Sequence, residues 1–187
     1  MKVMRKMMIK TNEFCIGDQI KVKVRGMGTF TATVHKILDN GEVLFVFDQC
    51  VARRQMNSTN TNEGGFSNSE LSKWLYNEFS HKLPAKITSR LIDIGIPSYG
   101  MMFGHDEQFY KDYIEPDNDE QLELMKIRRN RVADYEDKEN GCGWYWLSNA
   151  TKKDWSSAHF ARCDSSGRAS YHGASASSGV RPYFVIG

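Results

Sequence analysis

The segment 148–179 carries the side chains best suited to contact a ligand. It is rich in Ser, Ala and Gly and lies between stretches of apolar, strand-forming residues. Aromatic side chains on a stiff framework provide contact area, and small polar residues adapt their hydrogen bonds to a partner. The residues expected to make the contacts are Trp155, His159, Arg168, Tyr171 and His172. The alternative is a serine-rich turn region that only covers the core.

Other groups of residues give weaker indications of chemistry. His105, Asp106 and Glu107 are the types used in acid–base catalysis or metal binding, but an exposed charged loop explains them equally well. No second histidine stands at metal-ligand spacing, and the chain has no G-x-S-x-G, P-loop or HExxH motif. We therefore expect a protein that is not an enzyme, with no metal and no cofactor.

The four cysteines are Cys15, Cys50, Cys142 and Cys163. They are far apart in the sequence and form no CxxC pair, which argues against a zinc ribbon and a thioredoxin-like site. The spacing favours reduced and mostly buried thiols.

The charge balance narrows the classes of partner. The 187 residues include 25 basic and 23 acidic side chains and carry a net charge of +2, so no strong field favours nucleic acid. No stretch approaches the roughly 18 apolar residues of a membrane span, so we expect no membrane insertion. The N-terminal MKVMRKMMIK lacks a signal-peptide apolar core of about 7–15 residues. We therefore expect synthesis in the cytoplasm without a signal peptide.

The first elements that must position these residues are strands. Residues 20–25 and 29–37 alternate between apolar and polar types, and 42–47 are almost wholly apolar. Asn40-Gly41 between the last two runs is a strong hairpin signal, because this pair accepts positive φ at low cost. Residues 1–55 are therefore predicted to form an N-terminal antiparallel β-meander.

The middle of the chain predicts helices. Ser67 and Glu70 form a capping-box pattern, which is followed by an apolar stripe at helical spacing. This stripe consists of Leu71, Trp74, Leu75 and Phe79. A second helix is expected to run from Pro84 until Gly95, and a third over 119–131, acidic in its first turn and basic in its last. Strands, then helices, then strands indicate an α+β fold.

The C-terminal region is expected to form the rigid framework. Trp144 and Trp146 fall on one face of a predicted strand and, with Trp74, are expected to be core anchors. Residues 180–186 (VRPYFVI) are predicted to be an apolar strand, in which Arg181 needs a partner if it is buried. We expect that partner to be a carboxylate or loop carbonyl groups.

Four segments resemble a large family of uncharacterised bacterial and prophage proteins with a C-type-lectin-like domain. They are WYWLSN at 144–149, SSAHFARCDSSGRASYHGASASSGVRPYFVI at 156–186, FSNSELSKWLYNEF at 66–79 and EPDNDEQLELMKIRRNRVA at 115–133. The resemblance runs from about residue 40 to the end. Ser148 departs from the pattern, since the family usually has Arg after its WWL motif.

The resemblance implies a C-type-lectin-like mixed α/β domain over 56–187. It also implies a non-enzymatic ligand-binding domain of phage or prophage type that recognises a protein or carbohydrate at a cell surface. The protein would be virion-associated, and the meander would be an attachment or homo-oligomerisation module. The alternative is an intracellular enzyme or regulator on a formylglycine-generating-enzyme-like scaffold, although Cys142 and Cys163 are placed differently from the copper-binding cysteines of those enzymes.

Two further implications concern the loops. Calcium-dependent lectins use a Glu-Pro-Asn type triplet and a Trp-Asn-Asp triplet, but here Glu115-Pro116-Asp117 is followed by no such second triplet. We expect 115–117 to be a helix N-terminal cap and predict no calcium site.

The residue types within 156–178 also match those produced when diversity-generating retroelements alter Asn codons, which makes diversification a hypothesis for these loops.

Overall fold

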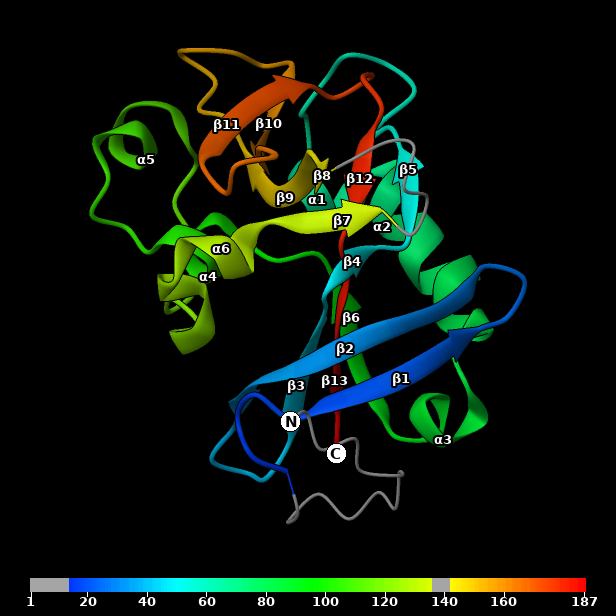
Figure 1. Cartoon of the computed structure of the whole chain (residues 1–187). Helices are drawn as coiled ribbons and strands as arrows, with labels where there is room; N and C mark the ends of the chain where they lie inside the picture. Colours follow the sequence, from blue (N-terminus) through cyan, green and yellow to red (C-terminus); the bar gives the residue numbers. More distant parts are fainter. Residues whose placement is uncertain (1–13, 136–141) are drawn as a thin grey trace.

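Residues 14–135 and 142–187 are described by the computed structural model, and they form a mixed α/β fold with two mainly antiparallel five-stranded sheets and short helices (Figure 1). The strands are β1 Gln19–Val24, β2 Gly28–Ile37, β3 Val43–Phe47, β4 Gln49–Cys50, β5 Ala52–Arg54, β6 Leu91–Gly95, β7 Ala133–Tyr135, β8 Cys142–Gly143, β9 Tyr145–Ala150, β10 His159–Cys163, β11 Ala169–Gly173, β12 Ser178–Val180 and β13 Tyr183–Ile186. The helical segments are α1 Gly65–Asn68, α2 Glu70–Trp74, the π-helix η2 Leu75–Phe79, the 3-10 helix η3 Ser80–Lys82, α3 Ala85–Thr88, α4 Tyr99–Phe103, α5 Gln108–Tyr113, the 3-10 helix η4 Glu123–Lys126 and α6 Arg128–Arg131. The basic N-terminal segment and most of the turn expected at 134–143 lie outside the described residues.

The first sheet has the strand order β1-β2-β3-β13-β6. Exposed and buried residues alternate along β1, as the period-two pattern requires of a half-buried strand. Gly41, in the turn before β3, has a φ of 86°, a conformation that glycine adopts without strain. The C-terminal strand β13 lies between β3 and β6, where Phe184 faces Phe45 on one side and Ile94 on the other.

The second sheet has the strand order β11-β10-β9-β12-β5, and β4, β7 and β8 form a small third sheet. The chain passes between the two large sheets four times, from β3 to β5, from β5 to β6, from β6 to β9 and from β12 to β13 (Figure 1). The apolar strand expected at 180–186 is therefore divided at Arg181-Pro182. Between β12 and β13, the carbonyl of Pro182 accepts from the N–H of Phe47 at 3.0 Å. Because β3 pairs with β13 and β5 pairs with β12, residues before and after position 55 contribute to both sheets.

The core consists of two apolar clusters on opposite faces of these strands. Phe45, Phe184 and Trp146 belong to the first cluster, which α2 and η2 cover. Val46 and Tyr145 belong to the second, which α4 covers. All five residues of β3 are buried for this reason, since both of its faces lie against side chains.

The helices are shorter than the sequence patterns suggest. The cap of α2 is Ser69, whose hydroxyl accepts from the N–H of Ser72, and the expected cap Ser67 lies within α1 instead. The helix after Pro84 ends at Thr88, because the following residues pair with β13 as β6. The helix expected over 119–131 is divided into η4 and α6.

Candidate ligand-binding surface

The loop 151–159, between β9 and β10, is held by a buried amide. Asn62 is 4% exposed, and its Nδ2 donates to the carbonyl oxygens of Thr151 at 3.0 Å, Ser156 at 3.0 Å and His159 at 3.1 Å. The hydroxyl of Thr151 also donates to the carbonyl of Ser156 at 2.8 Å. Together these bonds pair the carbonyl groups at both ends of the loop, so the loop has a defined conformation.

Five side chains meet on the surface beside this loop. We call them the aromatic surface cluster: Phe109, Tyr113, Trp155, His159 and Tyr171. The ring centroids of Trp155 lie 4.3 Å from Tyr171, 5.2 Å from Tyr113 and 5.4 Å from His159. Phe109 stacks on Tyr171 at 5.9 Å. Trp155 remains 37% exposed, so the cluster presents aromatic surface to a partner.

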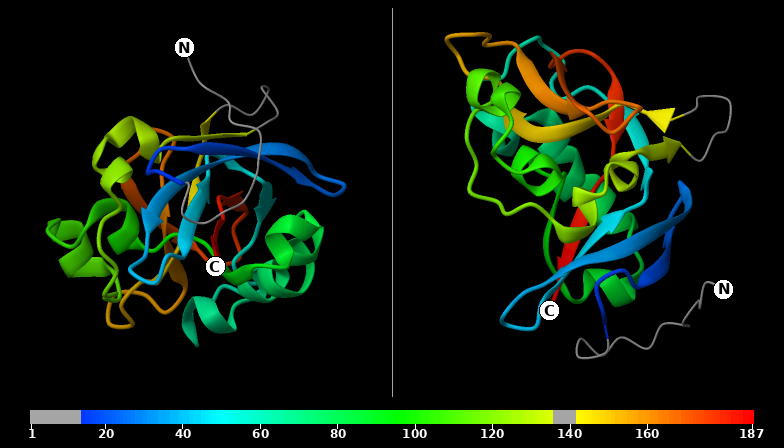
Figure 2. Two further views of the ribbon diagram at one scale, coloured as in Figure 1. Left: turned by 90° about the horizontal axis from the view of Figure 1, so that it is seen from below. Right: turned by 60° about the vertical axis from the view of Figure 1, so that its left-hand side comes forward.

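The cluster joins helix α5 to the β10–β11 hairpin, which Figure 2 shows side by side. Phe109 also stacks on the fully buried Tyr99, with centroids 6.2 Å apart and rings 14° from parallel. The hydroxyl of Tyr99 in turn donates to Glu107 Oε2 at 2.6 Å. The surface rings are thus in contact with the second core cluster, which restricts their movement.

His159 is the polar member of the cluster. Its Nδ1 forms a hydrogen bond with Ser156 Oγ. Burial lowers the pKa of His159, because a partly buried imidazolium loses hydration. At neutral pH the side chain is therefore mainly uncharged and offers hydrogen bonds rather than a positive charge.

The other two expected contact residues lie elsewhere. Arg168 is exposed at the β10–β11 turn, at the opposite end of the hairpin from His159. His172 is exposed on β11, but successive residues of a strand face opposite sides. Tyr171 pairs with Ala161 and His172 with Phe160, so the alternation along β11 places His172 on the opposite face of the hairpin from Tyr171. The expected set of five is therefore reduced here to Trp155, His159 and Tyr171.

Phe109 and Tyr113 were not expected at this surface. The sequence places them within 98–118, a stretch with seven Phe, Tyr and Met residues that reads as a packed loop. This aromatic density is the only signal that pointed to them. Their contact with Tyr171 brings together segments that are far apart in the sequence, and the local sequence pattern does not predict such a contact.

The residues expected to be structural occupy different environments. Trp74 is 6% exposed, Trp146 is fully buried and Arg181 is 3% exposed. Trp144, expected in the core, is instead 39% exposed, because β9 begins only at Tyr145. The guanidinium of Arg162 lies 3.9 Å from the ring centroid of Trp144, a cation–π contact that covers one face of the indole.

Arg181 bonds mainly to carbonyl groups. Its Nε donates to the carbonyl of Phe47 at 2.7 Å, and its two terminal nitrogens donate to the carbonyl of Asn130 at 3.1 Å each. A further bond of 3.1 Å reaches the hydroxyl of Tyr145. The side chain thus connects the segment between β12 and β13 to α6.

Residues 115–117 do not cap a helix, because the next helical segment begins only at Glu123. Asp117 instead connects several loops. Its carboxylate accepts from the N–H groups of Gly100 at 3.1 Å and Asp119 at 2.9 Å and from Nδ2 of Asn149 at 2.7 Å, and it lies 3.1 Å from Nε2 of His105. Burial acts to raise the pKa of Asp117, but these hydrogen bonds outweigh it and the pKa is lowered.

A cleft of about 460 Å³ lies next to this network, between the loop that contains Asn62 and residues 148–151. Asp117 and Asn149 contribute to its wall, but their polar atoms are already bonded to each other and to the backbone. The carboxylate of Asp117 is therefore already engaged, and the other ionisable side chains that line the cleft are Glu115 and Lys153.

Two of the three cysteines whose side chains the structure describes are buried. Cys163 is fully buried, and burial raises its pKa to about 11, so the reactive thiolate is disfavoured. Cys50 is buried, Cys15 is exposed, and the side chain of Cys142 lies outside the described part. Across residues 14–135 and 142–187, no three His, Cys, Asp or Glu side chains are grouped to hold a metal ion.

The fold and the surface define a small mixed α/β domain with an aromatic surface cluster. The chain belongs to the family DUF6273, a domain of unknown function, whose model matches residues 40–187. No curated protein and no solved structure matches the chain. Among the described residues, no helix has the length and apolar character needed to cross a membrane.

Proposed function

We propose that the chain is a non-enzymatic binding domain whose aromatic surface cluster recognises a protein or a carbohydrate. The observation that supports this function best is the placement of Trp155 and Tyr171. Two large rings lie 4.3 Å apart at the surface, and Trp155 keeps 37% of its area exposed. Such rings provide much contact area for little loss of conformational entropy on binding.

The surroundings of Trp155 favour a protein ligand over a carbohydrate. Lys153 and Asp154 are exposed directly before it, and Lys111 and Asp112 are exposed on α5. Binding hot spots commonly consist of Trp and Tyr near the centre of a contact, surrounded by polar residues that exclude water. Charges of both signs at the rim add specificity more than affinity.

We also infer, from the sequence resemblance, that the domain has a C-type-lectin-like arrangement and a phage or prophage origin. In such a protein the recognition loops would meet a host-cell or virion surface. The sheet of β1–β3 would serve attachment or self-association. The competing enzyme interpretation receives no specific support from the buried Cys163.

The test is a binding screen of labelled protein against whole bacterial cells and an array of glycans. Trp155→Ala and Tyr171→Ala should each weaken binding by about 2 kcal/mol or more, which is ~30-fold in Kd. Binding of the wild type to isolated glycans on the array would identify a carbohydrate ligand. Binding to cells that is lost after the cells are treated with protease would identify a protein ligand.

His172→Ala is the matched control, because His172 lies next to Tyr171 on β11 but faces the other side. It should change Kd less than about twofold, as exposed residues outside a contact do. Equal binding by wild type, Trp155→Ala and Tyr171→Ala, with unchanged thermal unfolding, would rule out the cluster as the binding surface.

A further inference from the structure

A polar cavity of about 340 Å³ lies between the β1–β2 hairpin and the residues of η4 and α6. The side chains that matter for its chemistry are Gln19, Thr33, His35, Asp48, Arg129 and Arg181. This volume greatly exceeds the roughly 30 Å³ that one water occupies, and it is at the lower end of the range for small-molecule sites.

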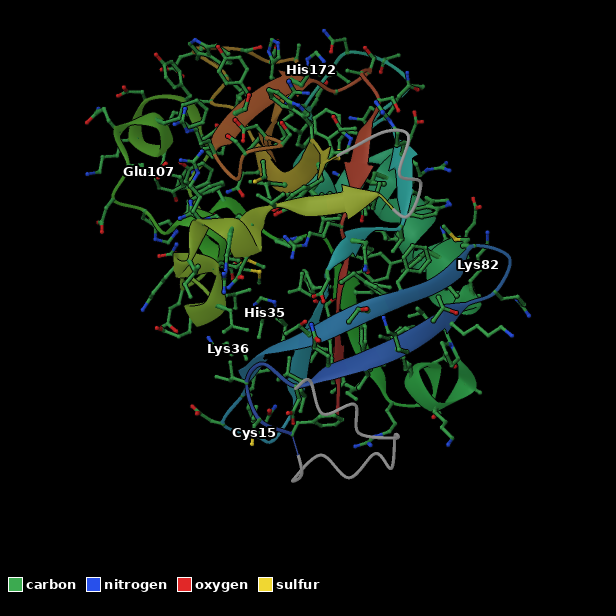
Figure 3. The ribbon with its side chains drawn as sticks, in the orientation of Figure 1. Cys15, His35, Lys36, Lys82, Glu107 and His172 are labelled. Atoms are coloured by element: carbon green, nitrogen blue, oxygen red, sulfur yellow. The ribbon has the colours of Figure 1, made fainter. Side chains whose placement is uncertain are left out.

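His35 reaches the cavity from an irregularity in β2. Val34 pairs with Phe45 and Lys36 pairs with Leu44, so His35 is an extra residue with no partner on β3 (Figure 3 labels His35 beside Lys36). Bulges of this kind redirect a side chain and often occur next to functional sites.

The imidazole of His35 is 4% exposed, and its buried Nδ1 has no hydrogen-bond partner. Burial, and then the nearby charge of Arg181, lower the pKa of His35 to about 3. The ring is therefore neutral at pH 7, with one N–H that can be donated to a ligand. A buried polar atom without a partner is uncommon in native proteins and calls for an explanation.

Arg181 brings a buried positive charge to the same cavity. No carboxylate of the described residues lies within 4.0 Å of its guanidinium, and its hydrogen bonds go to carbonyl groups and the hydroxyl of Tyr145. Burial acts to lower the pKa of Arg181, but Tyr145, Cys50 and Asp48 outweigh it and the pKa is raised, so the guanidinium is charged and would attract an anion close to it.

The remaining charges leave the cavity positive. The carboxylate of Asp48 accepts from the hydroxyl of Thr33 at 2.6 Å and from Nε2 of Gln19 at 2.9 Å, which fixes it to the hairpin. Arg129 adds a second guanidinium at the exposed rim. Two positive groups against one negative group leave a net charge of +1.

We propose that this cavity binds a small molecule through an oxyanion, a carboxylate or phosphate group, that is held between Arg181 and Arg129 with His35 as a neutral hydrogen-bonding partner. Gln19, Thr33 and His35 precede the family match at 40–187, whereas Asp48, Arg129 and Arg181 lie within it. The bound anion would therefore fix the N-terminal hairpin to the family domain.

The test is a titration of the full chain with inorganic phosphate and, separately, with succinate at pH 7.5. The imidazole signals are followed by NMR, and those of His35 are assigned with His35→Gln. We expect saturable shifts of the His35 signals, and the tighter of the two probes identifies the oxyanion. Arg129→Gln should weaken binding about tenfold, as the loss of one charge-assisted contact does.

Arg128→Gln is the matched control, since Arg128 is the exposed neighbour of Arg129 on α6 and does not line the cavity. It should leave Kd within about twofold, because an exposed charge outside the site is screened. The proposal is wrong if neither probe gives saturable shifts at His35, or if the two arginine variants weaken binding equally.

Discussion

The carboxylate of Asp117 accepts hydrogen bonds from two backbone N–H groups and Asn149, and it also contacts His105. Because backbone N–H groups can only donate, this position needs an acceptor on both oxygens. The sequence motif around it suggested either a calcium ligand or a helix cap, yet its role is to connect loops. Residue type alone did not distinguish these roles, since a carboxylate can serve in each of them.

Asp117→Asn should lower the free energy of unfolding by about 1–3 kcal/mol at pH 7, because an amide NH₂ would face a backbone donor. The pKa of Asp117 in the folded chain is below its ordinary value of 3.8. Its ionised form therefore contributes stability fully above pH 3.8, and this contribution is lost as the pH falls further.

Urea denaturation at several pH values measures this effect. The difference between wild type and Asp117→Asn should be largest at neutral pH and shrink below pH 4. Asp112→Asn is the control, because Asp112 is exposed and bonds only to the neighbouring Gln108 side chain. A difference that stays constant with pH would contradict the role given to the ionised carboxylate.

At the scale of elements, the strands β1 to β3 followed from local chemistry, whereas β6 and most helix lengths did not. The turn between β2 and β3 falls at Asn40-Gly41, where the pair itself favours the geometry. The sequence predicts residues 91–95 as the end of a helix, but they form β6 because β13 offers them a partner. Strand pairing of distant segments overrides such weak local preferences.

The sequence predicted only those members of the aromatic surface cluster that lie in or next to the β10–β11 hairpin. Trp155, His159 and Tyr171 converge because β10 and β11 pair antiparallel, with Ala161 opposite Tyr171. The contribution of α5 depends on packing between distant segments. The cavity at His35 was also missed, because the sequence does not show that Leu124, Arg129 and Arg181 lie close to this part of β2.

The loop 151–159 gives a prediction at this scale. Asn62→Ala removes three hydrogen bonds to loop carbonyls, so the loop should open locally while the sheets remain folded. Hydrogen–deuterium exchange of its amides should become about tenfold faster or more, which corresponds to ~1.4 kcal/mol of lost protection. Binding at the aromatic surface cluster should weaken with it.

Asn60→Ala serves as the control, since Asn60 is an exposed asparagine in the same preceding loop whose side chain packs against Gly173 and accepts a 3.5 Å hydrogen bond from the N–H of Ser175. Its exchange pattern over 151–159 should match wild type. Unchanged exchange in Asn62→Ala would mean that the loop is held by other contacts.

At the scale of the whole molecule, the N-terminal hairpin and the family domain share one core. Among the buried residues of the first cluster, Ile20, Val22, Val24, Phe30 and Val34 come from β1 and β2. Burial of such side chains contributes about 1.5–3 kcal/mol each, so the five together contribute about 8–15 kcal/mol. That equals the whole stability of a typical domain, about 5–15 kcal/mol.

A fragment 40–187, which corresponds to the family match, should therefore fail to fold cooperatively. Circular dichroism and urea denaturation of the fragment, beside the full chain as control, measure this. A sharp two-state transition in the fragment would show that the hairpin is an independent addition.

The position of β13 between β3 and β6 affects how the chain folds during its synthesis on the ribosome. β3 is synthesised early, but the edge of β3 that pairs with β13 stays unpaired until Tyr183, the partner of Val46, has been synthesised. Until then Phe45 and Phe47 belong to an open apolar edge, which is prone to self-association in nascent chains. The edge of β3 is therefore protected only after Ile186 has been synthesised. A ribosome that stalls earlier would expose this apolar edge, and the nascent chain would depend on chaperones to prevent aggregation.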